Sequence, residues 1–120
     1  MDDALYAMQT IAEMPEFTRR SEHLLSGAER QDIIDYLANF PKAGVLIEGT
    51  GGIRKLRWSR QGSGKSGGVR VIYYFHNKQI PLYLVTVFGK GEKANLSKAE
   101  RNELAKLVRI LVQTWSIKDE

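Results

Sequence analysis

Three cations on two predicted strands form the group of side chains best suited to chemistry in this sequence. Lys55 and Arg57 alternate on a strand predicted over Ile53–Trp58, and Arg70 lies on the next strand, Val69–Phe75. Alternate residues of a strand point to one side of a sheet, so we expect Lys55 and Arg57 to share a face. Arginine forks match phosphate oxygens. Such a group can bind a phosphodiester and stabilise its anionic pentavalent state while a ribose 2′-hydroxyl attacks.

The charge distribution points to the same part of the chain. From Gly49 to Gly91 there is no Asp or Glu, although this segment holds eight of the 18 Lys and Arg residues; all 14 acids lie outside it. Such segregation costs self-repulsion in a folded domain and is typical of a protein with an anionic partner. A solvated, charged face of a sheet is the alternative interpretation.

Further residues extend this candidate nucleic-acid surface. Lys90 and Lys93 follow the last predicted strand and complete the cationic group with Lys55, Arg57 and Arg70. Aromatic rings can stack on unpaired bases, but we expect at most one of the three nearby tyrosines to do so, because a strand tyrosine that faces helices is more often core. The additional candidates for RNA binding are Arg54, Arg60, Lys65 and Tyr74.

Several other chemistries lack their residues. The chain has no cysteine, and its two histidines, His23 and His76, lie in separate regions, so neither a metal site nor a cofactor is expected. The segment Gly62–Ser66 resembles part of a phosphate loop, but Ser59 stands where that motif needs glycine, and a strand follows instead of a helix. No apolar run is long enough for a membrane span and no secretory signal is evident, so a cytoplasmic location is expected.

The predicted elements place these residues in an α+β domain. A short strand within Met8–Glu13 precedes two helices, which the capping pair Ser26 and Glu29 separates, and a second capping pair, Ser97 and Glu100, opens the last helix. We expect a small antiparallel sheet, mixed at its edge, with an N-terminal αα-hairpin and a C-terminal helix packed on one face. The face with Lys55, Arg57 and Arg70 is then open. Residues 1–7 are predicted to be a disordered or non-native extension of a single domain, 8–120.

Four segments in order resemble the RelE/HigB-like toxins of bacterial type II toxin–antitoxin systems. They are Gly49–Arg57 (GTGGIRKLR), Gly67–Phe75 (GGVRVIYYF), Val87–Lys93 (VFGKGEK) and Asn95–Leu104 (NLSKAERNEL). The resemblance covers residues 8–113 and implies a RelE-like fold. It also implies an mRNA interferase that cleaves messenger RNA in the ribosomal A site and is neutralised by a cognate antitoxin.

By position, the resemblance implies that Lys55, Arg57 and Arg70 match the family's strand cations. Lys90 and Lys93 lie in the loop where the family often has a basic residue. The chain departs from RelE in having no tyrosine after Tyr83, so another group, such as a lysine acting as base, would have to move the proton. Two alternatives stay open, a ParE-like gyrase poison from the same superfamily and a non-catalytic nucleic-acid-binding module.

Overall fold

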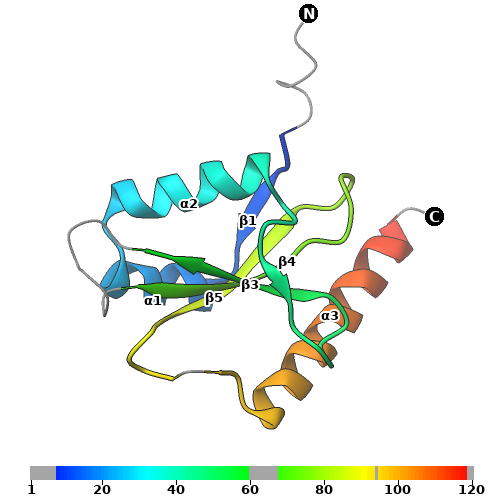
Figure 1. Cartoon of the computed structure of the whole chain (residues 1–120). Helices are drawn as coiled ribbons and strands as arrows, with labels where there is room; N and C mark the ends of the chain where they lie inside the picture. The colour runs from blue at the N-terminus through cyan, green and yellow to red at the C-terminus, as the bar shows by residue number, and fades with distance from the viewer. Residues whose placement is uncertain (1–7, 60–67, 94, 119–120) are drawn as a thin grey trace, which may run out of the picture.

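The computed structural model describes residues 8–59, 68–93 and 95–118, and within them it has three helices and a five-stranded sheet (Figure 1). The elements are β1 (Ile11–Glu13), α1 (Pro15–Leu24), α2 (Gly27–Asn39), β2 (Val45–Leu46), β3 (Ile53–Trp58), β4 (Val69–Tyr74), β5 (Leu82–Gly89) and α3 (Lys98–Lys118). The strand order is β1-β5-β4-β3-β2, and only the β1–β5 pair is parallel among these strands. The predicted α+β class with a mixed edge is confirmed, whereas the predicted extension 1–7 lies outside the described residues.

One detail differs from the expectation, because the helices lie on both faces of the sheet (Figure 1). Phe17 of α1 and Leu37 of α2 pack on Tyr73 and its neighbours on one face. Val108 of α3 packs on Ile53 and Ile72, which point to the other face. Ile53 and Ile72 make one half of the second face apolar, and the burial of this half under α3 stabilises the packing of the helix on the sheet. The face that carries Lys55, Arg57 and Arg70 is therefore covered at one end.

The two predicted capping boxes are confirmed. Ser26 Oγ accepts the Glu29 N–H (3.0 Å), and the Glu29 carboxylate accepts the Ser26 N–H (2.9 Å), at the start of α2. Ser97 and Glu100 repeat the arrangement at the start of α3 (3.1 and 2.9 Å). Each box satisfies two backbone donors that a helix start leaves without partners. The second box fixes where α3 begins relative to the loop after β5.

A two-residue strand, β2, was not predicted from the sequence. The chain that leads into it is held by two side chains of the sheet. Tyr73 Oη accepts the Gly44 N–H (2.8 Å) and donates to the Pro41 carbonyl (2.8 Å), while Arg54 Nη1 donates to the carbonyls of Gly44 (2.8 Å) and Lys42 (3.1 Å). These tertiary hydrogen bonds hold the chain before β2 at the edge of the sheet.

The far end of α3 is anchored on β5. Trp115 Nε1 donates to Tyr83 Oη (2.9 Å), so this tyrosine serves the attachment of the helix. The pairing of β4 with β5 shifts by one residue between Ile72 and Tyr73. Because of this irregularity, the consecutive residues Val85 and Thr86 of β5 both face α3.

Among the described residues, no helix is both long enough and apolar enough to cross a lipid bilayer.

Candidate nucleic-acid interface

The sheet register brings three predicted cations together. Arg57 of β3 lies directly opposite Arg70 of β4, which in turn lies opposite Phe88 of β5. Lys55 is two residues from Arg57 on the same strand and shares its face. Arg57 is exposed, and Lys55 and Arg70 are half-buried. We call Lys55, Arg57 and Arg70 the cationic row.

The row lacks compensating negative charge. Within residues 8–59, 68–93 and 95–118, no carboxylate forms an ion pair with any of its three members. Among the described residues, the Arg70 guanidinium group makes only one long hydrogen bond, from Nη1 to the adjacent Val69 carbonyl (3.4 Å). Like charges placed directly opposite on neighbouring strands destabilise a sheet. A bound phosphate would relieve the repulsion between Arg57 and Arg70 and accept their forked donors.

Lys93 extends the row on its β5 side. Its ammonium group lies 5.0 Å from the centre of the Phe88 ring and forms an ion pair with Glu100 of α3. The Lys93 hydrogen bond and the Ser97 N–H hold the pKa of the Glu100 carboxyl below its usual value. Lys93 is therefore fixed beside the ring that neighbours Arg70, with its charge partly balanced.

The loop that carries Lys90 and Lys93 is held in place from two further directions. The Lys90 N–H donates to the Gly68 carbonyl (2.9 Å), which sets the start of this loop beside the start of β4. Glu92 accepts the Gly89 N–H (3.0 Å) and forms an ion pair with Arg20 of α1. The Gly89 N–H, assisted by Arg20, lowers the pKa of Glu92. These contacts place the loop with both lysines beside the start of β4, where Arg70 lies.

The remaining predicted residues do not join the row. Arg54 points to the opposite face of the sheet, where the carbonyls before β2 engage its guanidinium group. Tyr74 is 4% exposed beneath α3, and burial raises the pKa of its hydroxyl, which lies 3.0 Å from His76 Nδ1. Arg60 and Lys65 lie outside the described residues.

A groove of about 460 Å³ lies beneath the first turns of α3, next to Phe88. Arg20 and Lys93 line it together with the carboxylates Glu16, Glu100 and Glu103. Carboxylates repel a polyanion at short range. This groove therefore suits an anion less well than the open side of the sheet over Arg57 and Arg70.

Sequence reasoning missed the residues that support the row. Glu92 and Arg20 are 72 residues apart, so no local spacing could pair them. Glu100 was identified as a helix-capping residue, but its second carboxylate oxygen binds Lys93 as well. Phe88 was given no role. The available signal was that Lys93 precedes Glu100 of the second capping box by seven residues, which places a cation and an anion close together in sequence.

The comparisons with known proteins identify the family and the fold of the chain. The protein-family model described as the RelE toxin of the RelE/RelB toxin–antitoxin system matches residues 40–118 of this chain, a range that includes the whole cationic row. A double arginine-to-alanine variant of the Escherichia coli toxin RelE, solved in its free state, superposes with a TM-score of 0.53 at 12% sequence identity. The alignment covers 72% of this chain and 88% of that protein, so the two share a fold. The chain belongs to the RelE family of toxins from toxin–antitoxin systems.

Proposed function

We propose that this toxin is a ribosome-dependent endoribonuclease that cleaves messenger RNA in the A site and thereby inhibits translation. The observation that carries the proposal is the cationic row, in which Arg57 lies directly opposite Arg70 and, among the described residues, neither is paired with a carboxylate. Family membership supports a toxin with an antitoxin partner. The row adds a surface suited to a phosphodiester.

In the proposed reaction the ribose 2′-hydroxyl attacks the adjacent phosphorus and the bond to the 5′-oxygen of the next nucleotide breaks. The products are a 2′,3′-cyclic phosphate and a 5′-hydroxyl, and the reaction needs no metal ion. Arg57 and Arg70 hold the non-bridging oxygens, whose negative charge grows in the pentavalent state. Lys55 and either Lys90 or Lys93 stabilise charge or transfer the protons that leave the 2′-oxygen and reach the 5′-oxygen.

The shortage of proton-transferring groups at the row supports a requirement for the ribosome. Within the part of the chain that the structure describes, no histidine lies on the row, and the ammonium of Lys93 is tied to Glu100. A site of this kind depends on a substrate already held for in-line attack, which contributes a large share of rate acceleration. Messenger RNA fixed in the A site is such a substrate.

Cleavage of ribosome-bound and free messenger RNA by the purified chain tests the proposal. We expect cuts within translated codons on programmed ribosomes, with 2′,3′-cyclic phosphate ends, and little cleavage of the free RNA. Arg19→Ala serves as the matched control for variants of the row, because this arginine is on α1 with a 70% exposed side chain. Fragments with 3′-hydroxyl ends would rule out attack by the 2′-hydroxyl. Trapped gyrase–DNA complexes without RNA cleavage would identify a gyrase poison instead.

A further inference from the structure

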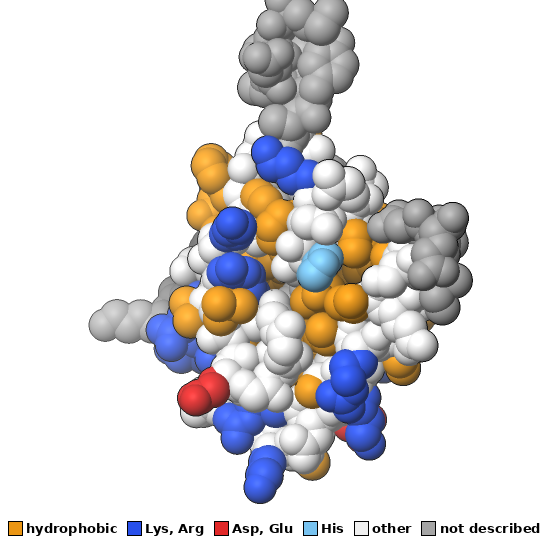
Figure 2. Space-filling view, turned by 90° about the vertical axis from the view of Figure 1, so that its right-hand side faces the viewer, with side chains coloured by type: hydrophobic (Ala, Val, Ile, Leu, Met, Phe, Trp, Pro, Cys, Tyr) orange, Lys and Arg blue, Asp and Glu red, His pale blue; other side chains and the backbone are white. Residues whose placement is uncertain are grey.

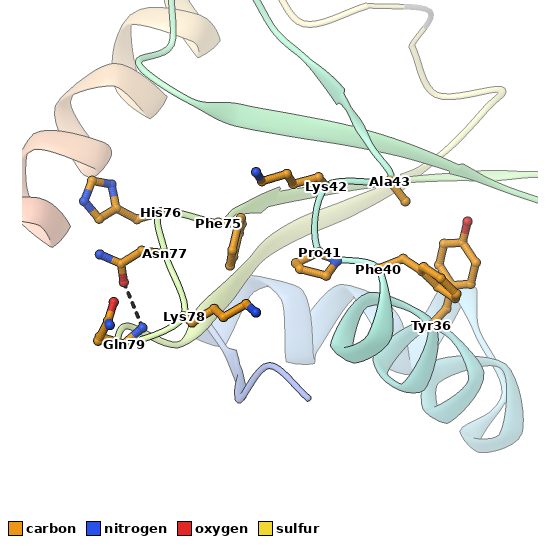
Figure 3. A pocket seen from close by; sticks show the side chains of 10 residues that line it. All are labelled: Tyr36, Phe40, Pro41, Lys42, Ala43, Phe75, His76, Asn77, Lys78 and Gln79. Atoms are coloured by element: carbon orange, nitrogen blue, oxygen red, sulfur yellow. Dashed lines mark hydrogen bonds between the residues drawn. The ribbon is translucent and has the colours of Figure 1, made fainter. Parts of the chain in front are cut away.

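A second concave surface lies at the end of the sheet away from the row. It is a cavity of about 700 Å³ between the C-terminal end of α2, the chain before β2 and the turn that joins β4 to β5. Figure 3 shows Phe75, at the end of β4, pointing toward the space beside Pro41, with Lys42 on one side of it and Lys78 on the other. We call Phe40, Lys42, Phe75 and Lys78, with Tyr36, the α2 cavity.

Large apolar side chains of this region are left in contact with solvent. Phe40 is 57% exposed and Tyr36 38% exposed. Their rings are 5.2 Å apart, and Tyr36 also meets Trp58 of β3 edge-on at 5.5 Å, so an aromatic strip leads away from the cavity. Val45 and Leu46 of the edge strand β2 are exposed as well. A grouping of exposed apolar residues rimmed by polar ones is typical of a surface that binds a partner.

The charges around the cavity have one sign. Lys42 and Lys78 line it, and no Asp or Glu is among the described residues that do so. Figure 2 shows the corresponding side of the molecule, where apolar side chains lie among Lys and Arg and acidic side chains are scarce. The occupant that complements this surface carries negative charge beside at least one bulky apolar group.

The α2 cavity is separate from the cationic row. Arg70 is near the start of β4 and Phe75 follows its end, which corresponds to a distance of about 17 Å along the strand. Phe75 also packs with the core on the α1 and α2 face, whereas the row lies on the α3 face. A ligand in this cavity therefore does not compete directly with a phosphate bound between Arg57 and Arg70.

We propose that the α2 cavity is a docking site for an acidic segment of the antitoxin, which inserts a large apolar side chain between Phe40 and Phe75. The observations favour a protein over RNA. The cavity is mainly apolar, and among the described residues that line it Lys42 and Lys78 carry the positive charge, whereas a groove that binds RNA follows the phosphate backbone with a continuous series of cations. The proposal depends on the toxin family, which has an antitoxin partner, and not on RNA cleavage.

Titration calorimetry with the antitoxin encoded by the adjacent open reading frame tests this site. Phe40→Ala removes the apolar contact and Lys78→Glu reverses a flanking charge, both in an Arg70→Ala background that permits production of the toxin. We expect at least a tenfold loss of affinity for each variant, since central aromatic residues dominate protein interfaces. The Lys78→Glu effect should diminish as salt is raised. Ile110→Ala, an exposed apolar residue of α3, is the matched control and should bind unchanged.

A second measurement separates the docking site from the RNA site. With the row intact, Phe40→Ala and Lys78→Glu should arrest growth like the unaltered toxin but escape neutralisation by the antitoxin. Thermal unfolding checks that both variants are folded, and Lys78 lies in an exposed turn away from the core. Unchanged antitoxin affinity overturns the proposal, as does a selective loss of RNA binding. Reduced antitoxin affinity in a chain that never cleaves RNA would support the docking site while refuting the proposed function.

Discussion

Arg54 and Arg57 lie three residues apart on β3 and have opposite environments. Arg54 points to the face covered by α1 and α2, where the carbonyls of Lys42 and Gly44 accept its hydrogen bonds. Arg57 points to the other face, opposite Arg70, and its guanidinium group has no hydrogen-bonding or ionic partner among the described residues. The same side chain thus stabilises the fold at one position and is available to an external anion at the other. Strand alternation, not residue type, distinguishes the two uses.

The two ends of the α3 face show a related contrast. At one end, Ile53, Ile72 and Tyr74 are buried under α3. At the other end, Arg57 and Arg70 lie beyond the helix and reach solvent. The position of α3 therefore determines how much of this face is open to solvent. The capping box at Ser97 and Glu100, with the ion pair to Lys93, fixes that limit.

Replacing Arg70 with alanine should produce the largest effect on activity. We expect cleavage on programmed ribosomes to fall by about a hundredfold or more, comparable to the loss of one donor that stabilises a developing oxyanion. Urea unfolding should show little loss of stability, because the change also removes the repulsion from Arg57. Cleavage at the normal rate would place the site elsewhere. Arg19→Ala, measured in parallel, should retain full activity.

Replacing Gly44 with alanine should produce a large effect on stability. A Cβ there would lie 2.7 Å from Tyr73 Cε1 and 2.9 Å from its hydroxyl oxygen, next to the hydrogen bond that holds the chain before β2. We expect a loss of about 1–3 kcal/mol in the free energy of unfolding, typical of overpacking. Gly27→Ala is the control, because apart from its chain neighbours and the backbone of its own helix no atom lies within 4 Å of its Cβ position, and alanine favours a helix. Equal stability of the two variants would contradict the account of Tyr73.

Arg54→Ala tests the comparison between the two arginines of β3. The change leaves the Gly44 carbonyl, in a buried position, without its donor, and should cost about 1–3 kcal/mol in the free energy of unfolding. Cleavage per folded molecule should stay near that of the unaltered chain. The opposite result, lower cleavage at unchanged stability, would assign Arg54 to RNA binding as the sequence predicted.

The smallest effect concerns pH and the two carboxylates that hold the Lys90–Lys93 loop. The folded-state pKa values of Glu92 and Glu100 are lowered, so their contribution to stability is complete above the unfolded-state pKa and is lost as the pH falls through the folded-state values. Glu92→Gln and Glu100→Gln should therefore be less stable than the unaltered chain at pH 7, and the difference should shrink below about pH 4. Urea midpoints measured across this range provide the test. Glu22→Gln, an exposed glutamate of α1, should show no such difference.

Local patterns were sufficient for most of the fold. The strand over Ile53–Trp58 was predicted with its observed bounds, and the Ser26 and Ser97 capping boxes were located correctly, because each depends on residues close in sequence. Strand alternation also put Lys55 and Arg57 on a common face, and the register then placed Arg70 opposite Arg57. These features depend on periodicity and on short hairpin connections.

The features that were missed depend on contacts between distant segments. The sequence did not reveal that α3 occupies the second face, because an apolar residue such as Ile72 does not indicate which helix will cover it. It assigned Arg54 to RNA binding, since the carbonyls that engage this arginine become neighbours only after α2 and β3 have packed. The pairing of Arg20 with Glu92 was hidden for the same reason.

The parallel pairing of β1 with β5 also bears on how the chain acquires its structure during synthesis. Gln9 Nε2 donates to the Ile80 carbonyl (2.6 Å) across 71 residues of sequence, and Ile11 pairs with Leu82. The first strand therefore has no partner until the fifth has left the ribosome, and contacts over such separations form slowly. Core residues of α1 and α2 remain exposed during that interval, because the strands they cover come later in the chain. The five-stranded sheet that carries the cationic row is therefore complete only after β5, its last strand, has been synthesised.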